Sequence, residues 1–319
     1  MELEQAQQII RVLPKQRTLF DYYQDRYAIV LLEQKTKQPA PITFLKKTRF
    51  GKLLDKSAVK QIIAHKGDGI LSREDLAYAE RKDAFQSVLT LGLWSGRRRG
   101  RDWAQTSRQG TNLVLQMNFD REHDRAYERL VGSIDESPFC ELAHPICTKG
   151  RTTMAWARLD IDWNSGEALV EEVQNDWVRG ALSAYKDAKR LSAAEGGEKR
   201  NFHFWGYHLG RAPSYIEYVE KYLLPRAKYW SEAMLTATIW FLREELNIPV
   251  IWYHTPETGK LVKNIKYNGP PVSIYSRLPK QFCFALTDET PPFVIEAARK
   301  KVRQRLRTGK DQFWRLDLH

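Results

Sequence analysis

Three strand-like segments, a helix and a fourth strand-like segment follow one another in the central part of this chain. The three segments, with alternating or β-branched patterns, are "TNLVLQMNF" (111–119), "TTMAWARLDID" (152–162) and "EALVEEVQ" (167–174). Asn164-Ser165-Gly166 predicts a hairpin turn between the last two. Residues 229–246 have the apolar spacing of a helix, and "IPVIWYHT" (248–255) is typical of a buried strand. The order β-β-β-α-β predicts an α+β fold with a mixed or antiparallel central sheet.

The chain of 319 residues is long enough for one large domain or two smaller ones. We expect residues 1–105 to form a mostly helical N-terminal region and residues 106–319 to form the mixed-sheet domain. The elements expected in the first region are helices at 3–12, at 56–67 and from Ser72, where Asp75 completes a capping pattern, and a strand at 25–34. In the second region we expect a helical insertion at about 190–228 and a basic helix near the C-terminus.

The formal net charge of +12 favours a polyanionic partner, either nucleic acid or a phosphate-rich small molecule. Two clusters concentrate this charge: Arg97, Arg98, Arg99 and Arg101, and Arg299, Lys300, Lys301 and Arg303. The alternative is a solvated basic surface without a specific partner.

Apolar runs in this sequence are too short for a membrane span, which needs about 18 residues. The N-terminal stretch lacks the basic, apolar and small-residue order of a secretory signal. Three cysteines form no CxxC pair, so we expect reduced thiols in a cytoplasmic protein.

Polar residues follow the apolar start of the third strand, in "LVEEVQNDW" (169–177). Strand alternation predicts that Glu172 and Gln174 face one side with Val170, while Glu171 faces the other side with Val173. Across the hairpin, Arg158, Asp160 and Asp162 are expected to share one face. We name Arg158, Glu172, Gln174 and Asp176 the polar row, and predict that it is an active or binding site. The alternative is a solvent-facing sheet with cross-strand Arg–Glu pairs.

The strand order and the later segment "SIYSRLPKQFCF" (273–284) resemble the GNAT acyltransferases. The resemblance implies that Glu172 is the general base and that Tyr275 protonates the leaving thiolate of acyl-CoA. The family's pyrophosphate loop would fall in 174–181, where only Gly180 and Ala181 match its pattern and Arg179 would compensate.

The pattern Asp160 or Asp162, then Glu172-x-Gln174, also resembles the glutamine variant of the PD-(D/E)xK nucleases. That resemblance implies a Mg²⁺ site formed by these carboxylates, where metal-bound water attacks a phosphodiester.

A third resemblance covers roughly residues 107–285. "LVEEVQNDW" is similar to the EEVQSDW signature in domains of large polyvalent proteins from phages and conjugative elements, with Asn175 in place of Ser. Further landmarks follow the same order: His144-Pro145, Arg158, Trp230, Trp252 to Thr255, and Tyr275 to Lys280. This resemblance indicates relatives rather than a chemistry. It adds His144 to the candidate site residues.

The segment 201–225 is rich in aromatic residues interleaved with Arg and Lys. Nucleic acid bases stack on surfaces of this composition. Packing of the aromatic residues within a helical subdomain is the interpretation that we favour. For the whole chain we expect a GNAT-like acyltransferase first, a metal-dependent nuclease second, and a non-catalytic nucleic-acid-binding or anti-restriction module third.

Overall fold

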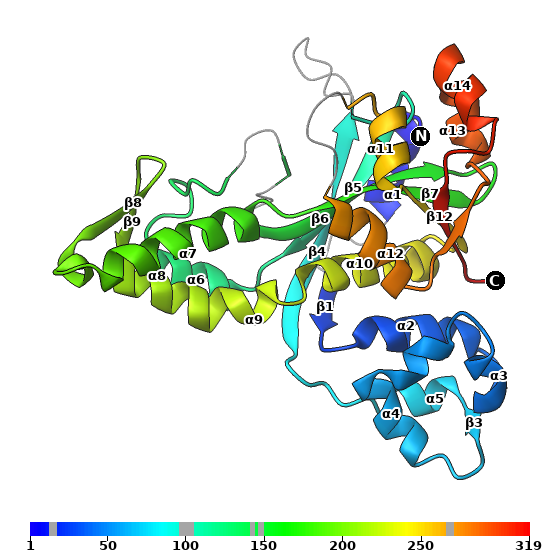
Figure 1. The fold of residues 1–319 in the computed structure, drawn as a ribbon, viewed down its shortest axis with the longest axis horizontal. Coiled ribbons are helices and arrows are strands. Elements are labelled where there is room, and N and C mark those ends of the chain that lie inside the picture. The colour runs from blue at the N-terminus through cyan, green and yellow to red at the C-terminus, as the bar shows by residue number, and fades with distance from the viewer. Residues whose placement is uncertain (13–17, 96–104, 141–143, 146–149, 266–270) are drawn as a thin grey trace.

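The computed structural model describes residues 1–12, 18–95, 105–140, 144–145, 150–265 and 271–319. Its centre is a mixed sheet of eight strands, which confirms the α+β class (Figure 1). In spatial order the strands are β1 (Thr18–Tyr22), β4 (Phe85–Ser95), β5 (Thr111–Asn118), β6 (Thr153–Asp162), β7 (Glu167–Gln174), β10 (Val250–Tyr253), β12 (Phe313–Asp317) and β11 (Ala285–Thr287). Neighbouring strands are antiparallel except β7 and β10, which are parallel. The predicted strands at 111–119, 152–162, 167–174 and 248–255 are thus confirmed.

Apolar side chains cover both faces of this sheet. On one face, Val170 and Ile251 belong to the main hydrophobic cluster, against which α10 (Trp230–Trp240) packs. On the other face, Leu169 and Trp252 join a second cluster with residues of α13 (Pro292–Ala297) and α14 (Lys300–Leu306). The predicted helix at 229–246 is α10 with the π-helical turn 241–245 that continues it. Between β10 and β12 lie α11 (Pro256–Val262), the π-helical turn 273–277 and α12 (Leu278–Gln281).

The N-terminal residues form helices and also supply two sheet strands, β1 and β4. The sheet therefore contains strands from both sides of the boundary expected at 105/106. The helices are α1 (Leu3–Val12), α2 (Arg26–Lys35), α3 (Ile42–Lys46), α4 (Ser57–Ala64) and α5 (Arg73–Leu76), with a 3₁₀ turn at 51–55 and a short β2–β3 pair (Ala40–Pro41 and Ile70–Leu71). The helices at 3–12 and 56–67 and the Ser72–Asp75 capping box are confirmed.

The strand expected at 25–34 is wrong, because this segment is helix α2. Its side chains from Tyr27 to Leu32 are all buried, and Gln34 is buried as well. A helix that is apolar on every side has no amphipathic period, so its β-branched and aromatic composition imitates a buried strand.

A second body of helices projects from the sheet, and we name it the arm (Figure 1). It contains α6 (Arg121–Leu130), α7 (Trp177–Ala193), a 3₁₀ turn at 197–199, α8 (Ala212–Tyr218), the π-helical turn 219–223, α9 (Leu224–Ala227), and the hairpin of β8 (Asn201–Phe204) and β9 (Tyr207–Arg211) at its end. Buried rings of Tyr127, Trp177 and Tyr218 meet edge to face in its interior. The insertion expected at 190–228 thus contains a β-hairpin besides helices. Among the described helices, none has both the length and the apolar character that a membrane span requires.

Candidate active site at the bulge of β7

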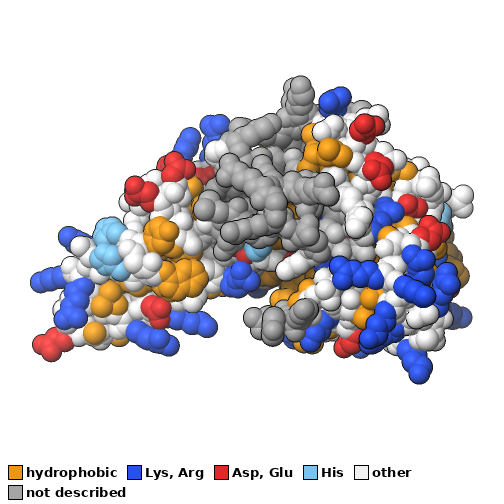
Figure 2. Space-filling view, turned by 90° about the horizontal axis from the view of Figure 1, so that it is seen from above, with side chains coloured by type: hydrophobic (Ala, Val, Ile, Leu, Met, Phe, Trp, Pro, Cys, Tyr) orange, Lys and Arg blue, Asp and Glu red, His pale blue; other side chains and the backbone are white. Residues whose placement is uncertain are grey.

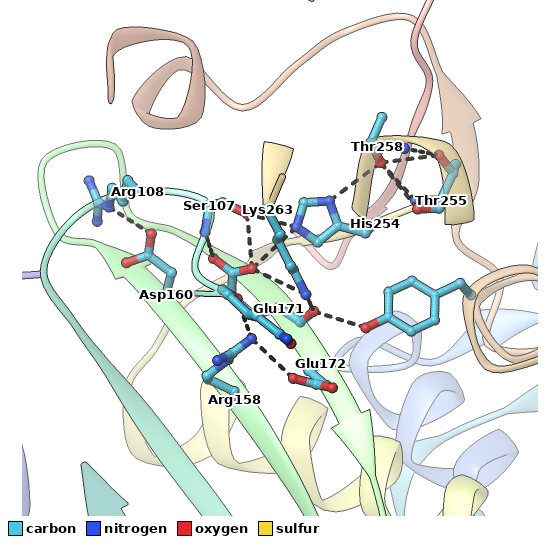
Figure 3. A network of polar contacts seen from close by, with 12 residues as sticks. Ser107, Arg108, Arg158, Asp160, Glu171, Glu172, His254, Thr255, Thr258 and Lys263 are labelled. Carbon is cyan, nitrogen blue, oxygen red and sulfur yellow. Dashed lines mark hydrogen bonds and ion pairs between the residues drawn. The ribbon is translucent and has the colours of Figure 1, made fainter. Parts of the chain in front are cut away.

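Glu171 is the extra residue of a β-bulge. In the register of β6 and β7, Arg158 lies opposite Glu172 and Leu159 lies opposite Val170, which leaves Glu171 between them. Val170 and Val173 consequently pack in the same hydrophobic cluster. The expectation that Glu172 faces the side of Val170, and Glu171 the side of Val173, is therefore wrong. Figure 3 shows both glutamates close to Arg158.

Arg158 and Glu172 form the centre of the polar row. Their nearest nitrogen and oxygen atoms are 3.0 Å apart, and their side chains are 0% and 20% exposed. The guanidinium also lies 4.9 Å from the ring centre of Trp94 and donates a hydrogen bond to the Gln105 carbonyl. Its Nε and Nη1 atoms are buried without a hydrogen-bond partner in the part of the chain that the structure describes. Buried donors of this kind call for an explanation, such as a ligand or a water molecule.

Asp176 and His144 lie next to this pair. The Nδ1 atom of His144 is 3.1 Å from the Asp176 carboxylate, which also accepts hydrogen bonds from Gln174 (2.8 Å) and Trp156 (3.2 Å). Burial alone would raise the pKa of Asp176, but the bonds from His144, Gln174 and Trp156 outweigh it and hold that pKa below its usual value. The ring of Trp156 stacks on that of Trp94 with 6.0 Å between centres, which connects His144 and Asp176 to Arg158.

Tyr275 approaches the bulge from the π-helical turn after α11. Its hydroxyl donates a hydrogen bond of 3.1 Å to the Glu171 carbonyl. Burial, and then the negative charge of Glu172, raise the pKa of this phenol well above its usual value. The phenol therefore stays protonated at neutral pH. The structure thus brings the four residues of the polar row into one region with His144 and Tyr275.

The Glu171 carboxylate is buried in a second network, which the sequence did not reveal (Figure 3). It accepts hydrogen bonds from the Ser107 amide (2.7 Å) and hydroxyl (2.9 Å), and it lies 3.3 Å from His254 and 3.5 Å from Lys263. Burial would raise its pKa, but His254 and Lys263 outweigh that effect and hold the pKa well below its usual value. Burial also lowers the pKa of His254 and of Lys263. This network joins β7 to the end of β10 and to α11.

Arg108 engages the carboxylates of the alternative metal site. Its guanidinium is 2.6 Å from Asp160 and 3.2 Å from Asp162, and the amino group of Met1 is 3.0 Å from Asp160. Among the described residues, no three His, Cys, Asp or Glu side chains converge as a metal site would require. A cation at these carboxylates would have to compete with Arg108, and at Glu172 with Arg158.

The residues expected at a pyrophosphate loop lie in the first turns of α7. Arg179 is 68% exposed and forms an ion pair of 2.8 Å with Asp176. A Cβ atom added to Gly180 would be 2.7 Å from Cδ1 of Phe139, so close packing explains this glycine. Ala181 is fully buried, and its carbonyl accepts a hydrogen bond from Tyr215. Arg179 is therefore the one of these three residues that could contact a phosphate of the expected acyl donor.

The two basic clusters have different outcomes. Arg97, Arg98, Arg99 and Arg101 lie outside the described residues. Arg299, Lys300 and Lys301 are exposed at the start of α14, whereas Arg303 donates hydrogen bonds to the Glu296 and Ala298 carbonyls near the end of α13. The predicted C-terminal basic helix is therefore present as α14, with Arg303 in a structural role.

Comparison with known proteins gives no relative for this geometry. No family model, no curated protein and no solved structure matches the chain.

Proposed function

We propose that this chain is a GNAT-like acyltransferase that takes an acyl group from acyl-CoA. The observation that carries the proposal is the relation between β7 and β10. These parallel strands pair only from Glu167 to Val170 and from Val250 to Tyr253, whereas β7 continues to Gln174. The pairing ends because β10 ends at Tyr253, so the backbone of β7 after Val170 has no β10 partner. A GNAT-like enzyme holds its acyl donor at a place where two parallel strands cease to pair. Glu172 and Tyr275 are both found where the pairing ends.

In this mechanism, Glu172 accepts a proton from the attacking amine. The amine nitrogen bonds to the thioester carbon, the carbon–sulfur bond breaks, and the Tyr275 hydroxyl protonates the departing thiolate. The buried Nε and Nη1 atoms of Arg158 would stabilise the negative charge that develops on the carbonyl oxygen. The exposed Arg179 would meet the phosphates of the donor. The basic charge of the chain agrees with a polyanionic donor and with an acceptor associated with nucleic acid.

A thermal-shift experiment tests this proposal, with acetyl-CoA in one series and Mg²⁺ or Mn²⁺ in another. At about 100 times its Kd, a ligand of the native state stabilises it by ~2.7 kcal/mol, so the melting temperature rises measurably. We expect a rise with acetyl-CoA. A rise with metal alone, lost in Glu172→Gln, would contradict the proposal and favour the nuclease. No rise with either ligand would favour the non-catalytic binding module.

Tyr275→Phe separates acid catalysis from binding. We expect this variant to keep the acetyl-CoA shift but to release free CoA thiol more slowly when a primary amine is the acceptor. Tyr253→Phe is a matched control, because the Tyr253 ring lies 5.4 Å from that of Tyr275 and its buried hydroxyl has no hydrogen-bond partner in the described part of the chain. Equal rates of thiol release in both variants would rule out Tyr275 as the acid.

A further inference from the structure

The hairpin at the end of the arm presents aromatic rings to solvent. Phe202, Phe204 and Leu209 point inward and are buried, and the ring of Phe202 packs 5.2 Å from that of Tyr215. In contrast, Trp205 is 72% exposed and Tyr207 is 48% exposed. The aromatic segment 201–225 therefore divides into rings that hold the hairpin in place and rings that face outward.

Trp205 occupies a backbone conformation that suits other residues better. The pair Phe204 and Tyr207 closes a two-residue turn, in which Trp205 has φ of 50° and Gly206 has φ of 84°. Positive φ at both positions defines a type I′ turn, for which Asn-Gly is the preferred sequence. A bulky aromatic residue is disfavoured at the first position. The indole stacks on the Phe204 ring with 4.5 Å between ring centres, but most of its surface remains exposed and its backbone conformation is unfavourable. A backbone outlier at an exposed aromatic residue points to function.

Positive charge surrounds this hairpin. From Lys186 to Arg211 the sequence contains six Lys or Arg residues and three acidic residues. The exposed cations are Lys186, Lys189, Arg190, Lys199, Arg200 and Arg211. Figure 2 shows Lys and Arg side chains around the histidines at this end of the molecule. In the hairpin itself, His203 and His208 face each other across the two strands with 5.2 Å between ring centres.

We propose that this hairpin is a binding site for single-stranded nucleic acid. Trp205 and Tyr207 stack on unpaired bases, and the surrounding cations contact the phosphate backbone. Single strands are favoured over duplex, because duplex bases are already stacked on each other and cannot accept an aromatic ring without unstacking. The site lies outside the polar row, so it does not depend on the acyltransferase activity.

Fluorescence anisotropy with labelled oligo(dT) of about 12 nucleotides tests the proposal, with a duplex of equal length as the comparison. We expect Trp205→Asn to weaken oligo(dT) binding about 10-fold, since one stacked base is lost while the turn receives its preferred residue. Trp163→Asn is the control, because Trp163 is a partly exposed tryptophan in the turn between β6 and β7. This control should bind as the wild type does.

The charge contribution is measured separately with Arg200→Gln. This variant should reduce the slope of log K against log salt concentration by ~0.7, which is the value for one phosphate contact to a single strand. Three results would overturn the proposal: no binding of oligo(dT), equal affinity for single strand and duplex, or undiminished affinity in Trp205→Asn. Any shift caused by acetyl-CoA should persist in Trp205→Asn, so failure here is distinguishable from failure of the proposed activity.

Discussion

Arg158 and Glu172 lie 3.0 Å apart on adjacent strands, and the arginine side chain is inaccessible while the glutamate remains 20% exposed. The bulge at Glu171 produces this arrangement, because it moves Glu172 opposite Arg158. Burial of the Arg158 guanidinium beside a partly exposed carboxylate has a desolvation cost for the folded protein. The same arrangement places a fixed positive charge where a ligand can reach Glu172.

We predict that Arg158→Lys lowers the free energy of unfolding by ~2–4 kcal/mol. An ammonium cannot reproduce the hydrogen bond to the Gln105 carbonyl, the ion pair with Glu172 and the contact with Trp94 together. Urea unfolding measures the loss. Arg179→Lys is the matched control, since the exposed pair that it forms with Asp176 should change the value by less than ~0.5 kcal/mol. Equal losses in the two variants would contradict the prediction.

Gly180→Ala tests whether this glycine serves packing or a phosphate. The added methyl group would meet the Phe139 ring at 2.7 Å, so we expect a loss of ~1–3 kcal/mol despite the better helix propensity of alanine. The double variant with Phe139→Leu should regain part of this stability. If Gly180→Ala instead folds stably and abolishes the acetyl-CoA shift, the glycine belongs to a phosphate site.

The sequence predicted the four strands at 111–119, 152–162, 167–174 and 248–255 because each has a distinct apolar pattern between clear turn residues. It also predicted the polar row, because carboxylates and amides at the end of a buried strand need partners. The orientation of Glu171 could not be predicted, because the bulge is a property of the register between β6 and β7. The residues of β7 alone do not indicate it.

The network around Glu171 could not be predicted for a different reason. Ser107, His254 and Lys263 are separated from Glu171 by 64, 83 and 92 residues. His254 lies near the end of a predicted strand, and Ser107 and Lys263 belong to no motif in the sequence. The parallel pairing of β7 with β10 brings His254 close to Glu171, whereas Ser107 comes from the segment before β5. The strands expected from the sequence also do not include β4, which follows the short helix that begins after Ser72 and ends at Leu76.

We predict that Glu171→Gln destabilises the protein by ~3–5 kcal/mol at neutral pH. It removes the buried anion that compensates Lys263, a side chain that is 3% exposed. The double variant with Lys263→Met should be more stable than the single one, because no uncompensated charge remains. Lys260→Met is the control, since Lys260 is exposed on α11, which ends directly before Lys263. Urea unfolding of all four proteins decides the matter, and a double variant less stable than Glu171→Gln would refute this account.

The stability of the protein should fall as the pH falls below ~6.5, and His254 should account for part of the loss. Burial lowers the pKa of His254 in the folded state, whereas the unfolded imidazole titrates near ~6.5. Below that pH the unfolded state binds more protons than the native state, so acid favours unfolding, by up to ~1.4 kcal/mol per pH unit for one histidine. Burial also lowers the pKa of His123. The loss of stability in acid should therefore be smaller in His254→Gln than in the wild type, but it should not disappear.

Melting curves between about pH 7.5 and 5.5 measure how steeply the stability falls with pH. His65→Gln, which removes an exposed imidazole, is the control variant. Identical slopes in His254→Gln and the wild type would show that His254 is not held neutral by the fold.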